Sequence, residues 1–212
     1  NSAELIRHWE KHYVRASLVG IDLSPQLLMA QQALSPQRFG LRANAIQLPI
    51  PNRSVSGIIN NEMIADLHTF VARADTLSEA LAITQHSLTH MGIRPDAWGY
   101  LTRDHIEEIL AKQLNMDYSI LPAFTDAISA IFEYSLELPF DSPRISACSP
   151  VGINIGAIHF LEEIRRILKP GGWAWLSEYG SVNPGYFPSS TMTTVVSSHT
   201  EWSIQFHHLQ QV

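Results

Sequence analysis

Short apolar runs alternate with helical patterns at the start of the chain. The apolar residues 18–21 end in Asp22, and Ser24-Pro25 follows, which is typical of a buried strand that leads into a helix. The same reasoning predicts a helix and two further strands, over residues 25–34, 39–46 and 55–60. An amphipathic pattern predicts one more helix over residues 2–13. This alternation favours an α/β domain with a parallel sheet.

From residue 64 to residue 143 the pattern becomes helical. Apolar positions spaced by three and four predict helices over residues 77–90, 102–114 and 124–136, and no strand signal competes with them. We therefore expect a helical insertion over residues 64–150. Long insertions near the edge of a sheet often serve as lids or substrate platforms.

The strand and helix patterns resume after residue 150. A helix is predicted over residues 155–168, Lys169-Pro170-Gly171-Gly172 stops it, and a strand follows over residues 173–178. The last segment has period two, which predicts a strand with one buried face. Its polar side carries His199, Glu201, Ser203, Gln205 and His207. The predicted parts are thus residues 1–63, 64–150 and 151–212, with the first and last forming one core.

Composition narrows the function classes. The chain has 212 residues, 45% hydrophobic residues and a net charge of −6, so it is globular and lacks the basic footprint of a nucleic-acid binder. Cys148 is the only cysteine, which suits a reducing, cytoplasmic compartment. No apolar run approaches the roughly 20 residues of a membrane span, so no membrane partner is expected.

Four short motifs follow one another along the chain in an order that is known from one protein family. They are Val19–Pro25, Ala43–Pro51, Ile59–Met63 and Leu168–Gly172, the last leading into a strand. Together they resemble the class I S-adenosylmethionine-dependent methyltransferases, over residues 1–63 and 150–212. The resemblance implies a Rossmann-like sheet with a helical lid. The family's first strand and Gly-rich loop are missing from this sequence, so we expect it to be a piece of a larger chain.

The resemblance also implies roles for single residues. Asp22 would bind the ribose hydroxyls of the cofactor, and Leu23 would pack against its adenine. Asn44 stands where the family usually has an Asp for the adenine amino group. Ala45 and Ile46 would border the adenine. Asn60, Asn61 and Glu62 would lie under the methionine end of the cofactor.

Methyl transfer from a sulfonium needs alignment of the nucleophile and the methyl group, and a base only where a proton must leave. The candidates for this chemistry are Glu62, Tyr179 beside Glu178, and His199. His199 and Gln205 could also hold one Fe or Mn ion, through a nitrogen and an amide oxygen. Each residue has a plainer interpretation: Asp22 as a turn residue, Glu62 as an acid at a helix start, the polar stripe as a solvent-facing edge.

The expected activity is methyl transfer to a small-molecule or carrier-protein-bound acyl substrate. The insertion is similar to that of carbon-methylating domains of polyketide synthase loading modules, some of which hold a malonyl group with a metal. The alternatives are a protein methyltransferase of the type that modifies respiratory complex I, a catalytically inactive binding module, and a nicotinamide dehydrogenase. The last fits the Lys-Pro-Gly-Gly motif less well.

Overall fold

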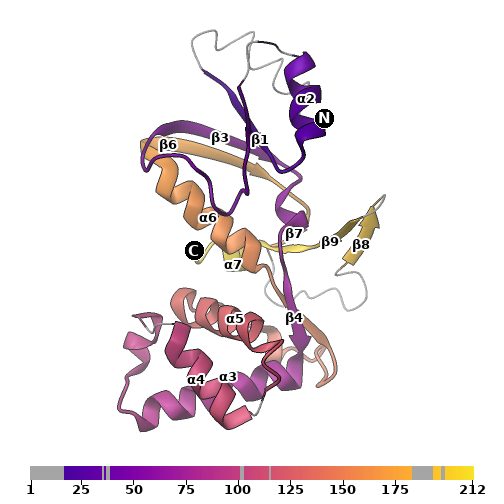
Figure 1. Cartoon of the computed structure of the whole chain (residues 1–212). Coiled ribbons are helices and arrows are strands. Elements are labelled where there is room, and N and C mark those ends of the chain that lie inside the picture. The colour runs from indigo at the N-terminus through magenta and orange to yellow at the C-terminus, as the bar shows by residue number, and fades with distance from the viewer. Residues whose placement is uncertain are drawn as a thin grey trace. The chain divides into compact units, whose positions relative to one another are not determined.

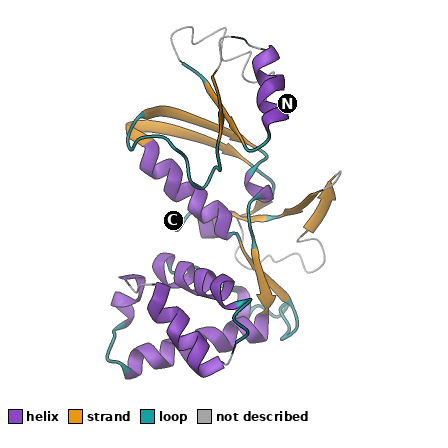
Figure 2. Ribbon diagram, viewed as in Figure 1, coloured by secondary structure: helices purple, strands orange, loops and turns teal. Residues whose placement is uncertain are grey.

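The protein is described by a computed structural model that covers residues 17–34, 36, 39–100, 103–114, 116–182, 193–196 and 199–212. Within these residues the chain is mixed α/β, with helices and several two-stranded sheets (Figures 1 and 2). The α/β class is therefore confirmed. The helix predicted over residues 2–13 lies outside the described residues. None of the described helices is long and apolar enough to cross a membrane.

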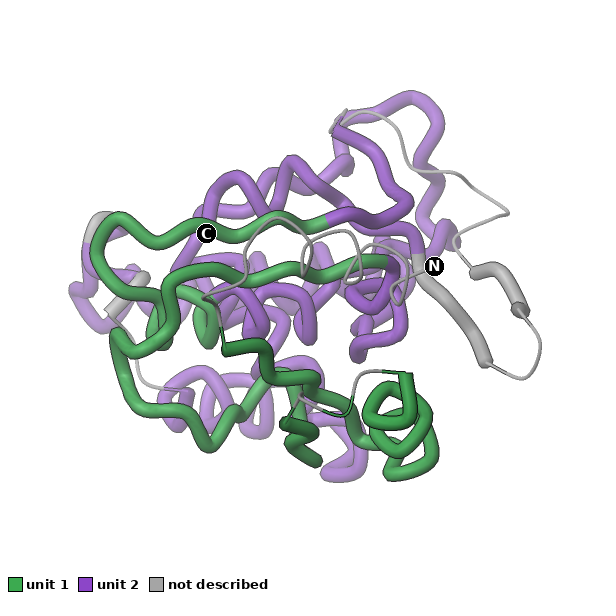
Figure 3. Tube along the Cα trace, turned by 90° about the horizontal axis from the view of Figure 1, so that it is seen from above, with its two compact units in different colours: residues 1–61, 162–176 green, residues 62–161, 177–212 purple. Residues whose placement is uncertain are grey.

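The chain forms two compact units (Figure 3). Unit 1 consists of residues 1–61 and 162–176, and unit 2 of residues 62–161 and 177–212. The chain therefore passes from one unit to the other three times, after Asn61, Leu161 and Leu176.

A small parallel sheet opens unit 1. Strand β1 (Val19–Asp22) pairs with β2 (Phe39–Arg42), and helix α2 (Pro25–Leu34) connects them. The register runs from Val19 opposite Phe39 to Asp22 opposite Arg42, so both strands end at the same edge. The predicted strand over residues 39–46 is thus shorter than expected.

Two glycines let α2 approach this sheet closely. A Cβ atom on Gly20 would lie 2.3 Å from Oε1 of Gln31, and one on Gly40 would lie 3.6 Å from the side chain of Leu28. Because both neighbours belong to α2, the helix covers the sheet face that carries these glycines.

A second strand pair completes the described part of unit 1. Strand β3 (Val55–Asn61) pairs with β6 (Leu168–Ser177), which follows directly on helix α6 (Ile155–Ile167). The N–H of Ser54 donates to the carbonyl of Ile167 at one end, and the N–H of Glu62 to that of Ser177 at the other, both at 2.8 Å. The two strands therefore run in the same direction. As predicted, α6 stops before Lys169, but β6 begins at once rather than at Trp173.

Unit 2 contains a helical group with its own core. Its main helices are α3 (Ala74–His90), α4 (Arg103–Leu114) and α5 (Leu121–Tyr134), with 3₁₀ turns η1 (Ile64–Asp66), η2 (Pro95–Tyr100) and η3 (Pro139–Asp141). Figure 1 shows the three helices packed together. Leu77, Leu110 and Ile128, one from each, are fully buried. The three predicted helices are confirmed to within a few residues.

Two short strands in unit 2 were not predicted. Strand β4 (Phe70–Arg73) pairs antiparallel with β5 (Pro150–Ile153), and Phe70 lies opposite Ile153. The expectation that residues 64–143 contain no strand was therefore wrong. With four residues each, these strands are too short to produce a periodic signal, and their pairing joins segments about eighty positions apart.

The C-terminal segment differs from the single strand that was predicted. It contains β7 (Gly180–Ser181), β8 (Thr193–Val196), β9 (His199–Trp202), β10 (Ile204–Gln205) and helix α7 (Phe206–Leu209). β10 pairs in parallel with β7 and ends at Gln205. Gln205 and His207 are both buried, so this part of the polar stripe is not a solvent-facing edge.

Candidate functional site

The carboxyl edge of the β1–β2 sheet brings two groups of predicted site residues together. The N–H of Ala43 donates to the carbonyl of Asp22 at 3.2 Å, which joins the end of β2 to the end of β1. Asp22 and Leu23 therefore lie beside the turn formed by residues 44–47. Sequence reasoning placed these groups on adjacent strands, and the register agrees.

Asp22 shapes the start of α2. Its Oδ1 atom accepts the N–H of Ser24 at 2.8 Å, and Ser24 Oγ accepts the N–H of Leu27 at 3.3 Å. The first contact is an Asx turn and the second is a helix cap. The plainer interpretation of Asp22 as a turn residue is thus observed. This bond uses one of the two carboxylate oxygens. Leu23, next to it, is 62% exposed.

Asn44 forms a second Asx turn at the same edge. Its Oδ1 accepts the N–H of Ile46 at 3.2 Å, and its carbonyl accepts that of Gln47 at 3.0 Å. Asn44 is exposed, while Ala45 and Ile46 are half-buried. The turn fixes the backbone of Asn44, Ala45 and Ile46, three of the four residues predicted to contact the adenine.

An ion pair on α6 supports the loop that follows this turn. Arg166 donates to both carboxylate oxygens of Glu163, at 2.7 and 2.6 Å, and to the carbonyls of Leu48 and Ile50, both at 2.8 Å. Glu163 in turn accepts the N–H of Leu48 at 2.6 Å. The Arg166 guanidinium holds the pKa of Glu163 below its usual range, although partial burial opposes this shift. Sequence reasoning did not identify this support.

The end of β3 has an unusual backbone. Glu62 has a φ of 55°, a conformation that non-glycine residues adopt infrequently and that often marks functional turns. The side-chain oxygen of Asn60 is buried, and no residue in the described part of the chain bonds to it. Glu62 is exposed and Asn61 is half-buried. Glu62 is therefore held by its backbone, through Ser177, with its carboxylate free to meet solvent or ligand.

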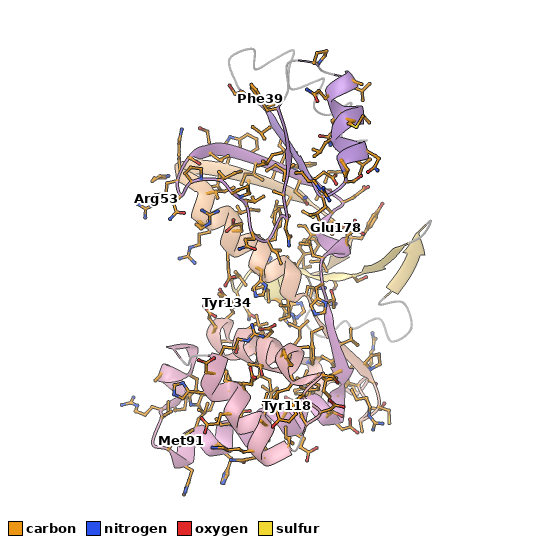
Figure 4. All side chains as sticks on the ribbon, in the orientation of Figure 1. Phe39, Arg53, Met91, Tyr118, Tyr134 and Glu178 are labelled. Carbon is orange, nitrogen blue, oxygen red and sulfur yellow. The ribbon has the colours of Figure 1, made fainter. Side chains whose placement is uncertain are left out.

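Glu178 stabilises the loop beyond Glu62. Its Oε2 atom accepts the N–H of Ala65 at 3.0 Å, and its Oε1 atom accepts the N–H of Tyr179 at 2.9 Å. Figure 4 labels Glu178, which follows β6. Tyr179 is 70% exposed, so its phenol contributes nothing to the core. Glu178 therefore anchors this loop, while Tyr179 is exposed to solvent.

Gly180 has no side chain, and this allows β10 to lie close beside the turn. A Cβ atom on Gly180 would lie 2.1 Å from the carbonyl oxygen of Ile204, and Ile204 donates its N–H to Tyr179 at 3.0 Å. In this short stretch Glu178 anchors a loop, Tyr179 exposes its phenol, and Gly180 allows the close contact with β10.

Within unit 2, several polar side chains are buried along the C-terminal segment and the residues that contact it. Asn154 Oδ1 accepts the N–H of Gln205 at 2.9 Å, and Asn154 Nδ2 donates to Thr69 Oγ1 at 3.0 Å. His207 and His208 are also buried, and their rings lie 4.2 Å apart between centroids. Burial lowers the pKa of His207, and it lowers the pKa of His208 to about 4.

The predicted metal ligands differ in how far they are described. Gln205 is 1% exposed, and neither of its amide atoms has a partner among the described residues. The side chain of His199, on β9, lies outside the described residues. The described residues contain no group of three His, Cys, Asp or Glu side chains that could hold a metal ion.

The predicted residues thus fall into two sets. Those assigned to the cofactor lie in unit 1: Asp22, Leu23, Asn44, Ala45, Ile46, Asn60 and Asn61. Glu62, Tyr179, His199 and Gln205 belong to unit 2. Sequence reasoning missed the anchoring role of Glu178 and the burial of His208. The signal for His208 was its position between apolar neighbours, Phe206 and Leu209. Comparisons with family models, curated proteins and solved structures returned no match.

Proposed function

We propose that this chain binds S-adenosylmethionine and transfers its methyl group. The observation that carries the proposal is the pair of parallel strands β1 and β2, which end side by side with Asp22 and Asn44. In open α/β sheets, ligands bind beyond the carboxyl ends of the strands, and an acid there commonly holds ribose hydroxyls. Beside Asp22, the side-chain oxygen of Asn44 would accept a hydrogen bond from the adenine amino group.

The surroundings of Asp22 suit the rest of a nucleoside. Leu23 exposes an apolar side chain next to the carboxylate, and Ile46 and Ala45 add apolar surface from the adjacent turn. Asn60 and Asn61, at the end of β3, would serve the methionine end of the cofactor. The buried oxygen of Asn60 is an acceptor that an ammonium group would satisfy.

The candidates for the chemistry are the three residues that the resemblance suggested for it, Glu62, Tyr179 and His199. Glu62 would act as a general base, or bind the amino group of the cofactor. Tyr179 and His199 would orient the acceptor. The strained backbone at Glu62 and the exposed phenol of Tyr179 support these roles. The substrate class is a small molecule or a carrier-bound acyl group.

A metal ion is a further part of the proposal. Gln205 fits this role because it has a buried amide oxygen that no described residue satisfies. A bound Fe or Mn ion would stabilise an enolate at the carbon to be methylated. His199 would be the second ligand.

Calorimetric titration of the full chain with S-adenosylmethionine tests the proposal. We expect saturable binding, with competition by S-adenosylhomocysteine and none by NADH. Competition by NADH would favour the dehydrogenase alternative. Absence of heat and of any thermal shift with either nucleoside would contradict the proposal and leave the inactive binding module.

A further inference from the structure

The side chain of Asn154 joins three segments of unit 2. Asn154 directly precedes α6, at a position where an asparagine often caps its own helix with the side-chain oxygen. Here that oxygen, Oδ1, accepts the N–H of Gln205 at 2.9 Å, across 51 positions of the chain. The amide nitrogen, Nδ2, donates to Thr69 Oγ1 at 3.0 Å and to the carbonyl of Ser203 at 3.3 Å. Asn154 is buried, so it links the start of α6, the residue before β4 and the C-terminal segment from inside unit 2.

Asn154 holds the C-terminal segment on both sides of Ile204. In a β-strand the backbone groups of one residue point to one edge, and those of its two neighbours point to the other edge. The contacts of Ser203 and Gln205 with Asn154 therefore lie along one edge of β10. Along the opposite edge, the N–H of Ile204 donates to the carbonyl of Tyr179 at 3.0 Å. The amide of Asn154 thus takes the place that a peptide group of a neighbouring strand would have.

The backbone of Tyr179 is held by β10 on one side and by Glu178 on the other. β10 pairs with β7 so that Ile204 lies opposite Gly180, and a Cβ atom on Gly180 would lie 2.1 Å from the carbonyl oxygen of Ile204. The N–H of Tyr179 donates to Glu178 Oε1 at 2.9 Å. Because the backbone of Tyr179 is fixed while its side chain is exposed, the direction of the phenol depends on where β10 lies.

We propose that Asn154 is a positioning residue for Tyr179. It fixes β10 at one edge, and β10 in turn fixes the backbone from which the phenol projects. The inference rests on the proposed function for the task of Tyr179, which is to orient the methyl acceptor. Asn154 itself is buried and would not touch that acceptor, so it acts only through β10.

Three substitutions separate positioning from a general loosening of the fold. Asn154→Ala removes the hydrogen bonds to Thr69, Ser203 and Gln205, and Asn154→Ser is a milder variant that keeps a hydroxyl at the same place. Thr69→Val keeps the shape of the side chain and removes only the contact between Asn154 and the residue before β4. It is the matched control, because it leaves both contacts with the C-terminal segment in place.

The experiment uses the full chain without ligand and has two readouts. One is amide hydrogen exchange at Ile204, with the N–H of Leu136 in the helical core as the reference. The other is the fluorine NMR spectrum of the chain labelled with 3-fluorotyrosine, in which Tyr179→Phe identifies one signal among those of the six tyrosines. We expect Asn154→Ala to speed exchange at Ile204 about tenfold or more relative to Leu136, and to shift the Tyr179 signal. Thr69→Val should leave both readouts close to those of the wild type.

Two outcomes would overturn the inference. One is wild-type exchange at Ile204 or an unchanged Tyr179 signal in Asn154→Ala, and the other is an equal change of both readouts in Thr69→Val. If Asn154→Ala does not fold, Asn154→Ser decides, with the same changes expected at smaller size.

A separate titration with S-adenosylmethionine keeps the proposed function apart from this inference. The wild type and Asn154→Ala should bind the cofactor equally, because the residues assigned to it lie in unit 1. Absence of binding by both would contradict the proposed function alone, since the exchange and fluorine readouts need no ligand.

Discussion

At the scale of single residues, the loops that carry the candidate site residues are held in place by hydrogen bonds from neighbouring charged side chains. Arg166 and Glu163 fix the loop after Asn44, and Glu178 fixes the loop after Glu62. Charge-assisted hydrogen bonds to backbone groups are stronger than neutral ones, and both carboxylates make them. The loops that carry the proposed ligand contacts are therefore set by their neighbours before any ligand binds.

Replacing Glu163 tests the first of these contacts. Glu163→Gln should lower the free energy of unfolding by about 2 kcal/mol, because it removes a charged partner from Arg166. Urea unfolding at neutral pH measures this loss. Glu79→Gln, at an exposed position of α3, should change stability by less than about 0.5 kcal/mol.

The pH dependence of Glu163 has a definite sign. Its pKa is lowered in the folded state, so its contribution to stability is full above the ordinary pKa of a glutamate, about 4.3. The contribution is lost as the pH falls from there through the folded pKa. The wild type should therefore lose its advantage over Glu163→Gln on acidification. An advantage that stays constant down to strongly acidic pH would contradict this assignment.

Replacing Glu178 tests the second contact. Glu178→Ala removes the acceptor for the N–H groups of Ala65 and Tyr179, so their hydrogen exchange should speed up at least tenfold. Amide exchange followed by NMR measures both sites in one experiment. The N–H of Glu62, which donates to the backbone of Ser177, is the internal reference. Unchanged exchange at Ala65 would show that the carboxylate does not hold the loop.

At the scale of elements, the helices and strands β1, β2 and β3 were predictable, but the short strands β4 and β5 were not. The helices of unit 2 have long apolar faces, and burial of those faces decides their place. Strands β4 and β5 depend on pairing between distant segments, which leaves no local signal. The period-two pattern continued past Gln205, but the structure has helix α7 from Phe206, in which His207 and His208 are buried.

The helical core gives a prediction at this scale. Leu110 of α4 is fully buried against the neighbouring helices, so Leu110→Ala should lower the free energy of unfolding by about 2–5 kcal/mol. Met91→Ala, at a residue that is exposed and labelled in Figure 4, should have little effect. Thermal unfolding of both variants measures the difference. Equal melting temperatures would contradict the described core.

At the scale of the whole molecule, the candidate residues divide between two units. The sequence placed Asp22 and Asn44 at adjacent strand ends because strand order and side-chain type are local properties. It could not predict the burial of Gln205 and His208, because their surroundings come from Asn154 and Glu137, fifty or more positions away. Local patterns therefore predicted the strand-end positions of Asp22 and Asn44 better than the burial of Gln205 and His208.

The central claim is that the carboxylate of Asp22 binds a nucleoside cofactor. Asp22→Asn tests it most directly, since an amide oxygen can keep the Asx turn to Ser24 while the charge is lost. Asp117→Asn is the matched control, because Asp117 makes the same turn to Ser119 at 2.8 Å in the helical part of unit 2.

The measurement is the dissociation constant for S-adenosylmethionine, by calorimetry, for the wild type and both variants. Hydrogen bonds to a charged group are worth about 1.5–3 kcal/mol, so Asp22→Asn should weaken binding about 10- to 100-fold. Asp117→Asn should leave the constant unchanged, and the melting temperature of Asp22→Asn should stay near that of the wild type. Equal affinity of the wild type and Asp22→Asn would contradict the account.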